Sequence, residues 1–298
     1  MIEMGDRMKE FRRDNHFVPK LYLKKWSSDG QKIWGYRTLV TQEIIPLWKL
    51  QSIRGVGYHK NLYTRISADG ETDEFELWFD KEFETPAEEA LYKATSNLRL
   101  SVEEWKRLIS FAAAQRVRTP ARLIKDLERW RNDMPEFLNS TIRDILQNLG
   151  DTRNTGILPK SKDTFDEMIL PVHVSREPSD DSDFSIFKVE TTVGRSMWLF
   201  GIKHILTNTL KVLLKHKWSI LHAAPSVKWI TSDDPVICLN YYKKGHYDFD
   251  GGWGFKGSEI IFLQNLKLWD ISMNHQVEPN NFFLPLKLHV RFHMVKKS

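Results

Sequence analysis

The sequence predicts an α+β fold, with a helical middle segment packed on a mixed or antiparallel sheet. Helix-start signals and helical apolar spacing concentrate in the middle of the chain, and short apolar runs between turn-forming residues occupy both ends. With 298 residues, of which 41% are hydrophobic and 28% charged, the chain can bury a large core. We therefore expect a single domain over residues 1–298.

The first segment is predicted to form strands and turns. Pro19 lacks a backbone donor and restricts Val18 to extended geometry. Ser28-Asp29-Gly30 is typical of a turn, and the KIWGYRT run that follows predicts a strand with Trp34 and Tyr36 on one face.

The middle of the chain carries clear helix boundaries. Thr85-Pro86-Ala87-Glu88 and Ser101-Val102-Glu103-Glu104 both have the residue types of a capping box. Pro120 predicts that the second helix ends or kinks near Arg118. A third helix is expected over residues 135–149.

The remainder of the chain is predicted to return to strands. Residues 150–186 are polar and predict a loop, an inserted flap or a boundary between subregions. Apolar residues at helical spacing then predict a helix between residues 198 and 213. The runs WSILHAA, KWIT, VICLN and EIIFL beyond it predict strands joined by turns.

Charge alternates along the chain in blocks that the net charge of +5 hides. Residues 61–104 carry 4 basic and 12 acidic side chains, whereas residues 105–131 carry 8 basic and 2 acidic ones. The blocks could neutralise one another in the folded protein, or form a basic surface for a phosphate-bearing partner such as nucleic acid. The sequence leaves both interpretations open.

Cysteine content and hydropathy indicate the compartment. Cys238 is the only cysteine, which excludes an internal disulfide and a multi-thiolate zinc site and favours the reducing cytoplasm. The most apolar helical window, beginning at Met197, is interrupted by Lys203, His204 and Lys211. We expect no secretory signal and no membrane association.

Gln115 and Arg118 interrupt an otherwise apolar helix face that also contains Leu108 and Phe111. An uncompensated charge in such a position is costly, so a buried carboxylate, a backbone carbonyl or a ligand anion should meet the guanidinium. Pairing with the acidic block of residues 61–104 is the structural alternative.

Two further candidates come from other parts of the chain. His16 lies in an aromatic cluster and could act as a general base or a metal ligand, although such a histidine is also common in cores. Asp233 lies in Thr231-Ser232-Asp233-Asp234-Pro235, between two predicted strands, where a carboxylate can hold a metal or act as a base. The same residue types form ordinary turns.

Arg122, Lys125 and Arg129 follow Arg118 at helical spacing if the helix continues through Pro120. Their side chains are candidates for phosphate binding.

Three separated stretches resemble a bacterial family catalogued as domain of unknown function 4238. They are His16-Phe17-Val18-Pro19 with Tyr22-Leu23, Gln115 with Arg118-Thr119-Pro120, and Thr231-Ser232-Asp233 with Pro235-Val236. The resemblance covers roughly residues 14 to 264. It carries no established activity, but it implies that His16, Gln115, Arg118 and Asp233 converge.

Three functions are therefore expected to compete. The first is an enzyme acting on phosphate esters such as nucleic acid, with a hydrolase assisted by a divalent metal as its specific form. In it, His16 and Asp233 would serve as base or metal ligands, Arg118 would stabilise negative charge and Gln115 would orient water. The second is a non-catalytic module that binds nucleic acid or protein. The third is an internal polar network that fixes the fold. The motifs of P-loop proteins, zinc proteases, serine hydrolases and kinases are absent from the sequence.

Overall fold

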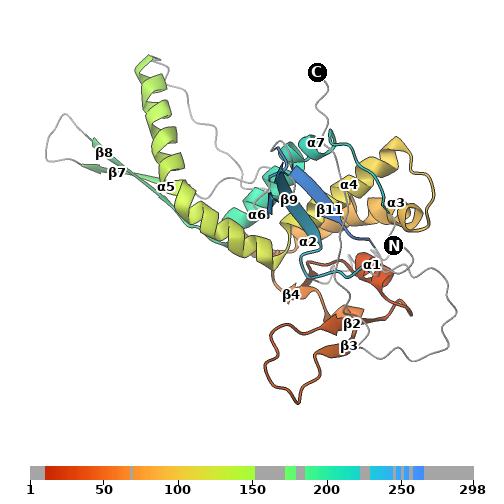
Figure 1. Ribbon diagram of the computed structural model, residues 1–298. Coiled ribbons are helices and arrows are strands. Elements are labelled where there is room, and N and C mark those ends of the chain that lie inside the picture. The colour runs from red at the N-terminus through yellow and green to blue at the C-terminus, as the bar shows by residue number, and fades with distance from the viewer. Residues whose placement is uncertain are drawn as a thin grey trace, which may run out of the picture.

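The computed structural model describes residues 11–67, 70–151, 172–178, 185–221, 229–243, 246–249, 252–254 and 258–264. Helices and strands in these residues confirm the α+β class (Figure 1). The strand pairs are antiparallel, as one of the two predicted arrangements required, but they form small separate sheets of two or three strands.

The N-terminal strands pair in short ribbons: β1 (Asp14–His16) with β4 (Tyr58–Lys60), β2 (Lys32–Tyr36) with β3 (Trp48–Ser52), and β5 (Arg65–Ser67) with β6 (Gly70–Thr72). The predicted KIWGYRT strand is confirmed by β2. Residues 20–26 differ from the strand-and-turn prediction. They form α1 (Lys20–Leu23) and the 3-10 turn η1 (Lys24–Trp26), because the Pro19 carbonyl accepts the N–H groups of Tyr22 and Leu23.

Of the two predicted capping boxes, the one at Ser101 forms and the one at Thr85 does not. The helix α4 (Val102–Val117) begins with the expected capping box, in which Glu104 accepts from the backbone of Ser101 at 2.7 Å. It ends as predicted, with Arg118 in the capping position. The helix α3 (Thr85–Thr95) follows α2 (Glu74–Phe79) and the π-helical turn η3 (Asp80–Glu84) without a break. The Thr85 hydroxyl therefore donates to Asp80 at 3.0 Å instead of capping α3.

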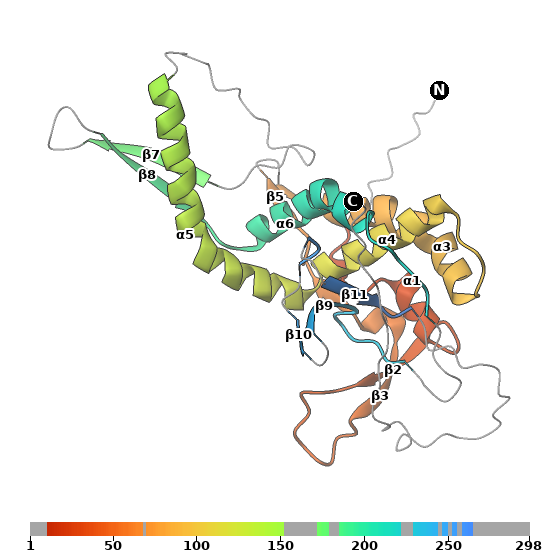
Figure 2. The same ribbon diagram turned by 45° about the horizontal axis from the view of Figure 1, so that its top comes forward.

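The third helix is longer than predicted. Helix α5 extends from Pro120 to Asp151, so the expected helix over residues 135–149 is its second half. Pro135 removes one backbone hydrogen bond, but it lies on an exposed position of a long amphipathic helix that continues on both sides. Figures 1 and 2 show α5 projecting from the body and changing direction near its middle, as a proline inside a helix can cause.

The remaining elements follow the predicted order, except that two of the predicted strands do not form in the described residues. The polar segment of residues 150–186 contains β7 (Val172–Pro178) and the start of β8 (Ser185–Thr191), while residues 152–171 and 179–184 lie outside the described residues. The expected helix appears as α6 (Arg195–His204), the π-helical turn η4 (Ile205–Thr209) and α7 (Leu210–Leu213).

The last sheet has the order β10-β9-β11 and is formed by β9 (Val236–Lys243), β10 (His246–Asp248) and β11 (Ser258–Phe262). The VICLN and EIIFL predictions are thus confirmed. The described parts of WSILHAA and KWIT, residues 218–221 and 229–231, form no strand, and residues 222–228 lie outside the described residues.

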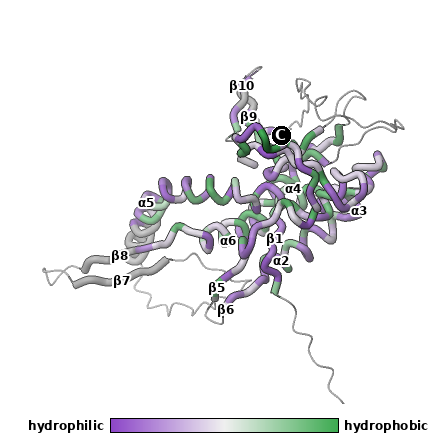
Figure 3. The backbone as a smooth tube through the Cα atoms, turned by 90° about the horizontal axis from the view of Figure 1, so that it is seen from below, coloured by the Kyte–Doolittle hydropathy of each residue, from purple (hydrophilic) through white to green (hydrophobic). Residues whose placement is uncertain are grey.

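Helix α4 forms the centre of the body, where the hydropathy view shows it surrounded by other elements (Figure 3). Its residues from Phe111 to Val117 are all buried. Ile109, Ala113 and Val117 pack in a cluster with β9, β11 and α6, whereas Leu108 and Phe111 belong to a second cluster with α1 and α3. Among the described residues, no helix has both the length and the apolarity needed to cross a bilayer.

Candidate active site

A cleft of about 1040 Å³ opens between β1, β4 and α2. Figure 3 shows β1 beside α2 at this place. The cleft is lined by side chains from the segment before β1 and from β1, α1, β4 and α2: Phe11, Arg12, Arg13, Asp14, His16, Lys20, Lys60, Asn61, Asp73, Glu76 and Leu77.

Hydrogen bonds to backbone groups hold the walls of the cleft in place. The Asn15 amide donates to the carbonyl of Arg12 and accepts from the Tyr63 N–H, each at 3.0 Å. The Asn61 N–H donates to the carbonyl of Arg13 at 2.8 Å, and the Arg12 N–H donates to Asp73 at 3.0 Å. These contacts fix the chain before β1 against both β4 and the start of α2.

His16 contributes a neutral imidazole to this cleft. The residue is only 7% exposed, and its Nε2 atom has no hydrogen-bond partner among the described residues. Its ring packs on Tyr58 of β4, with centroids 5.6 Å apart. Burial and the neighbouring charge of Lys20 lower the pKa of His16 below its usual value of 6.5. A neutral imidazole carries one basic nitrogen, so His16 can accept a proton at neutral pH.

Glu76 contributes a carboxyl group with the opposite shift. Burial raises its pKa to about 7, and the charge of Glu84 acts in the same direction, against the attraction of Arg118 and Arg12. Its Oε2 atom is buried without a hydrogen-bond partner in the described part of the chain. A substantial fraction of Glu76 is therefore protonated near pH 7 and can donate a proton.

Cations surround these two groups at the rim. Arg13, Lys20 and Lys60 all line the cleft, and none of them forms an ion pair with a carboxylate of the described residues. Arg12 is partly neutralised, because its guanidinium contacts Asp80 at 3.2 Å. Asp14, Asp73 and Glu76 line the same cleft, so its lining holds four cations and three carboxyl groups, and Arg13, Lys20 and Lys60 are the cations left to meet an anionic ligand.

Arg118 lies fully buried behind the cleft and already has its partners. Its Nη1 donates to Glu84 Oε1 at 2.7 Å, and its Nε donates to the carbonyl of Phe17 at 3.1 Å. The Phe79 ring lies under the guanidinium at 5.1 Å. Gln115, also fully buried, accepts from Nη2 at 2.9 Å when its amide oxygen faces the guanidinium. Of the partners that the sequence predicted for Arg118, the structure supplies both a carboxylate and a carbonyl.

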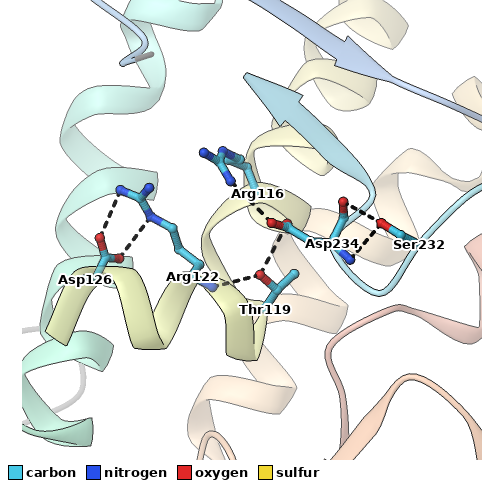
Figure 4. A network of polar contacts seen from close by, with 6 residues as sticks. All are labelled: Arg116, Thr119, Arg122, Asp126, Ser232 and Asp234. Atoms are coloured by element: carbon cyan, nitrogen blue, oxygen red, sulfur yellow. Dashed lines mark hydrogen bonds and ion pairs between the residues drawn. The ribbon is translucent and has the colours of Figure 1, made fainter. Parts of the chain in front are cut away.

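Asp233 does not line the cleft and is exposed. The next residue, Asp234, makes the inward contacts instead (Figure 4). Its Oδ1 accepts from the Thr119 hydroxyl at 3.3 Å, and its Oδ2 lies 3.6 Å from Arg116. Burial raises the pKa of Asp234, while the Arg116 charge opposes that rise. Ser232 closes the turn by accepting the Asp234 N–H at 3.2 Å.

The candidate phosphate-binding residues lie along α5. Arg122 contacts Asp126 at 2.9 Å, and Arg129 approaches the same carboxylate at 3.6 Å (Figure 4 shows the first pair). Lys125 is exposed. Arg118 belongs to α4, so the predicted continuous row of four cations is interrupted by the break at Pro120. Two of the three α5 cations therefore share an acidic partner within their own helix.

The three separated sequence stretches meet through side chains. Arg118 binds the carbonyl of Phe17, and the Tyr22 hydroxyl lies 2.7 Å from Thr231 Oγ1. The contact of Thr119 with Asp234 completes the set. A family model described as "Protein of unknown function (DUF4238)" matches residues 14–262, which include all three stretches. The chain belongs to this family. No curated protein and no solved structure matched the chain.

Sequence reasoning missed Glu76, Glu84 and Lys60. Glu76 shares a helix face with Phe79 and Phe83 at spacings of three and four residues, and both rings are buried. Glu76 interrupts an aromatic helix face in the same way as Gln115 and Arg118 interrupt an apolar one. It lies within the acidic block of residues 61–104, however, where one carboxylate among many does not stand out. Within the described residues, no group of three or more His, Cys, Asp and Glu side chains is arranged to hold a metal ion.

Proposed function

We propose that the protein is an enzyme that hydrolyses phosphate esters, with nucleic acid as the substrate class. The observation that carries the proposal is the pairing, in one cleft, of an imidazole with a lowered pKa and a carboxyl group with a pKa of about 7. Such oppositely shifted groups suit general base and general acid roles. The cations Arg13, Lys20 and Lys60 at the rim would bind the phosphates.

In the proposed reaction, His16 takes a proton from the attacking water or hydroxyl as its oxygen bonds to phosphorus. The bond from phosphorus to the leaving oxygen then breaks, and that oxygen receives the proton of the Glu76 carboxyl group. Both proton transfers match the protonation states that the cleft favours at neutral pH, a neutral His16 and a protonated Glu76. The rim cations would balance the negative charge that develops on the phosphoryl oxygens.

The other expected residues take different roles. Arg118 and Gln115 do not line the cleft, so they act as positioning residues. Arg118 holds the Phe17 carbonyl and Glu84 and sets the charge behind Glu76, and Gln115 holds the Arg118 guanidinium. The burial of these two residues supports the third expectation from the sequence for them, namely an internal polar network that fixes the fold. Asp233 has no part in the proposed reaction, because it lies outside the cleft lining.

The test is hydrolysis of RNA, DNA and a small phosphodiester, each measured with and without Mg²⁺ or Mn²⁺. We expect His16→Gln and Glu76→Gln to lower kcat by about 100-fold or more, as expected for loss of general acid or base catalysis. His204→Asn on α6 and Glu82→Gln in η3 are matched controls and should retain the wild-type rate, because neither side chain lines the cleft.

Two outcomes would contradict the proposal. Hydrolysis that survives both cleft substitutions, in variants whose melting temperatures match the wild type, would place the reaction elsewhere. Binding of nucleic acid without hydrolysis under any metal condition would instead support the non-catalytic alternative.

A further inference from the structure

The β2–β3 hairpin presents a face of aromatic and aliphatic side chains to solvent. Antiparallel pairing places Trp34 opposite Leu50 and Tyr36 opposite Trp48, and residues directly opposite one another project from the same side of a ribbon. Trp34 is 58% exposed, Tyr36 43% and Leu50 45%. The other side of the ribbon faces the protein, where Ile33 packs against the core cluster that contains α1 and α3.

Two of the rings on this outer face contact one another. The Tyr36 and Trp48 rings meet edge to face, with centroids 5.1 Å apart. Lys32 lies on the same side of the ribbon, opposite Ser52, and is exposed. The hairpin therefore offers exposed flat rings beside a cation.

The charge around the hairpin indicates an anionic occupant. The hairpin itself, residues 32–52, carries three basic side chains, Lys32, Arg37 and Lys49, and one acidic side chain, Glu43. Along the chain, β3 leads through η2 (Ile53–Gly55) into β4, which forms one wall of the cleft. Tyr58 of β4 packs on His16, and Lys60 of β4 lines the cleft. Figure 2 shows β2 and β3 as a separate lobe below α1.

We infer that the outer face of the β2–β3 hairpin is a stacking platform for the bases of single-stranded nucleic acid. Unpaired bases stack on aromatic side chains irrespective of sequence, while cations beside the rings attract the phosphates. Duplex nucleic acid buries its base faces and cannot use the platform. This inference rests on the proposed function, because it names single-stranded nucleic acid as the substrate class of the neighbouring cleft.

The experiment measures binding of fluorescein-labelled twelve-nucleotide RNA and DNA single strands to the full chain by anisotropy, with the matching duplexes in parallel. Trp34→Leu retains apolar bulk but removes the ring, and Trp34→Phe retains a ring. We expect Trp34→Leu to weaken single-strand binding roughly 5- to 100-fold, the loss of one stacked base. Trp34→Phe should restore most of the affinity, and wild type should prefer single strands to duplexes.

Two control variants separate stacking from general apolar contact. Tyr92→Ala removes a ring on α3 that is 57% exposed and should leave binding unchanged. Ile44→Ser changes a side chain that is 95% exposed in the loop joining β2 and β3 and should also bind normally. An equal loss of binding in Ile44→Ser, or wild-type affinity in Trp34→Leu, would overturn the inference. Binding to vesicles of phosphatidylcholine and phosphatidylserine without binding to single strands would overturn it as well.

The outcome is separable from that of the proposed function. The platform is tested by the affinity of Trp34 variants and the cleft by hydrolysis, so the two readouts are independent. A ring-dependent affinity together with no hydrolysis would support the platform and refute the catalytic proposal. Hydrolysis that requires His16 but is indifferent to Trp34→Leu, in both rate and affinity, would refute the platform alone.

Discussion

At Glu76, burial and the Glu84 charge outweigh the attraction of Arg118 and Arg12, so the pKa rises to about 7. At His16, burial and Lys20 act on a base and lower the pKa. The same low-polarity environment thus favours the uncharged form of both groups. That common cause explains how a neutral imidazole and a protonated carboxyl group can coexist in one cleft at neutral pH.

Arg118→Ala should lower the free energy of unfolding by about 3–5 kcal/mol, because it leaves the Glu84 carboxylate and the Phe17 carbonyl without their donor. Arg107→Ala on the same helix is the matched control, since Arg107 is 43% exposed and 3.9 Å from Glu103. Its effect should be less than about 1 kcal/mol. Urea unfolding measures both values, and equal effects would refute the structural role of Arg118.

Single residues were predictable where they break a pattern. Gln115 and Arg118 stand out because they interrupt an apolar helix face, and the structure places them fully buried. The spacing does not distinguish Asp233 from Asp234, since a turn of five residues does not determine which carboxylate points inward. Glu84, the partner of Arg118, lies 34 residues away along the chain, and no local pattern encodes that pairing.

At the scale of elements, the junction between α4 and α5 follows from three adjacent residues. Arg118 ends α4, Thr119 Oγ1 accepts the N–H of Arg122 at 3.2 Å, and Pro120 occupies the first position of α5. A capping threonine followed by proline is a strong helix start. The predicted end of the helix near Arg118 is therefore confirmed. Pro135 does not end α5, and the helix continues on both sides of it.

Gly57 is required where β4 begins. It has a φ of +65°, and a Cβ atom there would lie 2.9 Å from the Val18 Cβ. Gly57→Ala should therefore destabilise the protein by about 1–3 kcal/mol through backbone strain and overpacking. Gly55→Ala, where nothing lies within 4 Å of the added methyl group, should leave stability nearly unchanged. Thermal unfolding of the two variants compares them, and similar melting temperatures would contradict this explanation.

At the scale of the whole molecule, part of the acidic block of residues 61–104 neutralises cations from other segments. Glu84 and Asp80, from the acidic block, neutralise Arg118 and Arg12. On α5, Asp126 partners Arg122 and Arg129. The cations without a described carboxylate partner at the cleft rim could not be identified from sequence, because net charge by segment does not show which cations are already paired.

Charge reversal compares the two basic surfaces. Lys60→Glu at the cleft should weaken binding of single-stranded nucleic acid roughly tenfold and reduce the salt dependence by about one phosphate contact. Lys125→Glu on α5 should have a smaller effect, since Lys125 lies beside residues that share Asp126. Titrations at several salt concentrations measure both. A larger loss of affinity in Lys125→Glu than in Lys60→Glu would indicate that nucleic acid binds at α5 and not at the cleft.

The most direct test of the cleft is the pH dependence of kcat/KM for a phosphodiester. His16 acts as a base only when neutral, so the rate should fall as pH decreases below the lowered pKa of that imidazole. Glu76 acts as an acid only when protonated, so the rate should fall as pH rises through about 7. The account predicts a bell-shaped profile whose alkaline limb is lost in Glu76→Gln. An alkaline limb near pH 7 that persists in Glu76→Gln would contradict it.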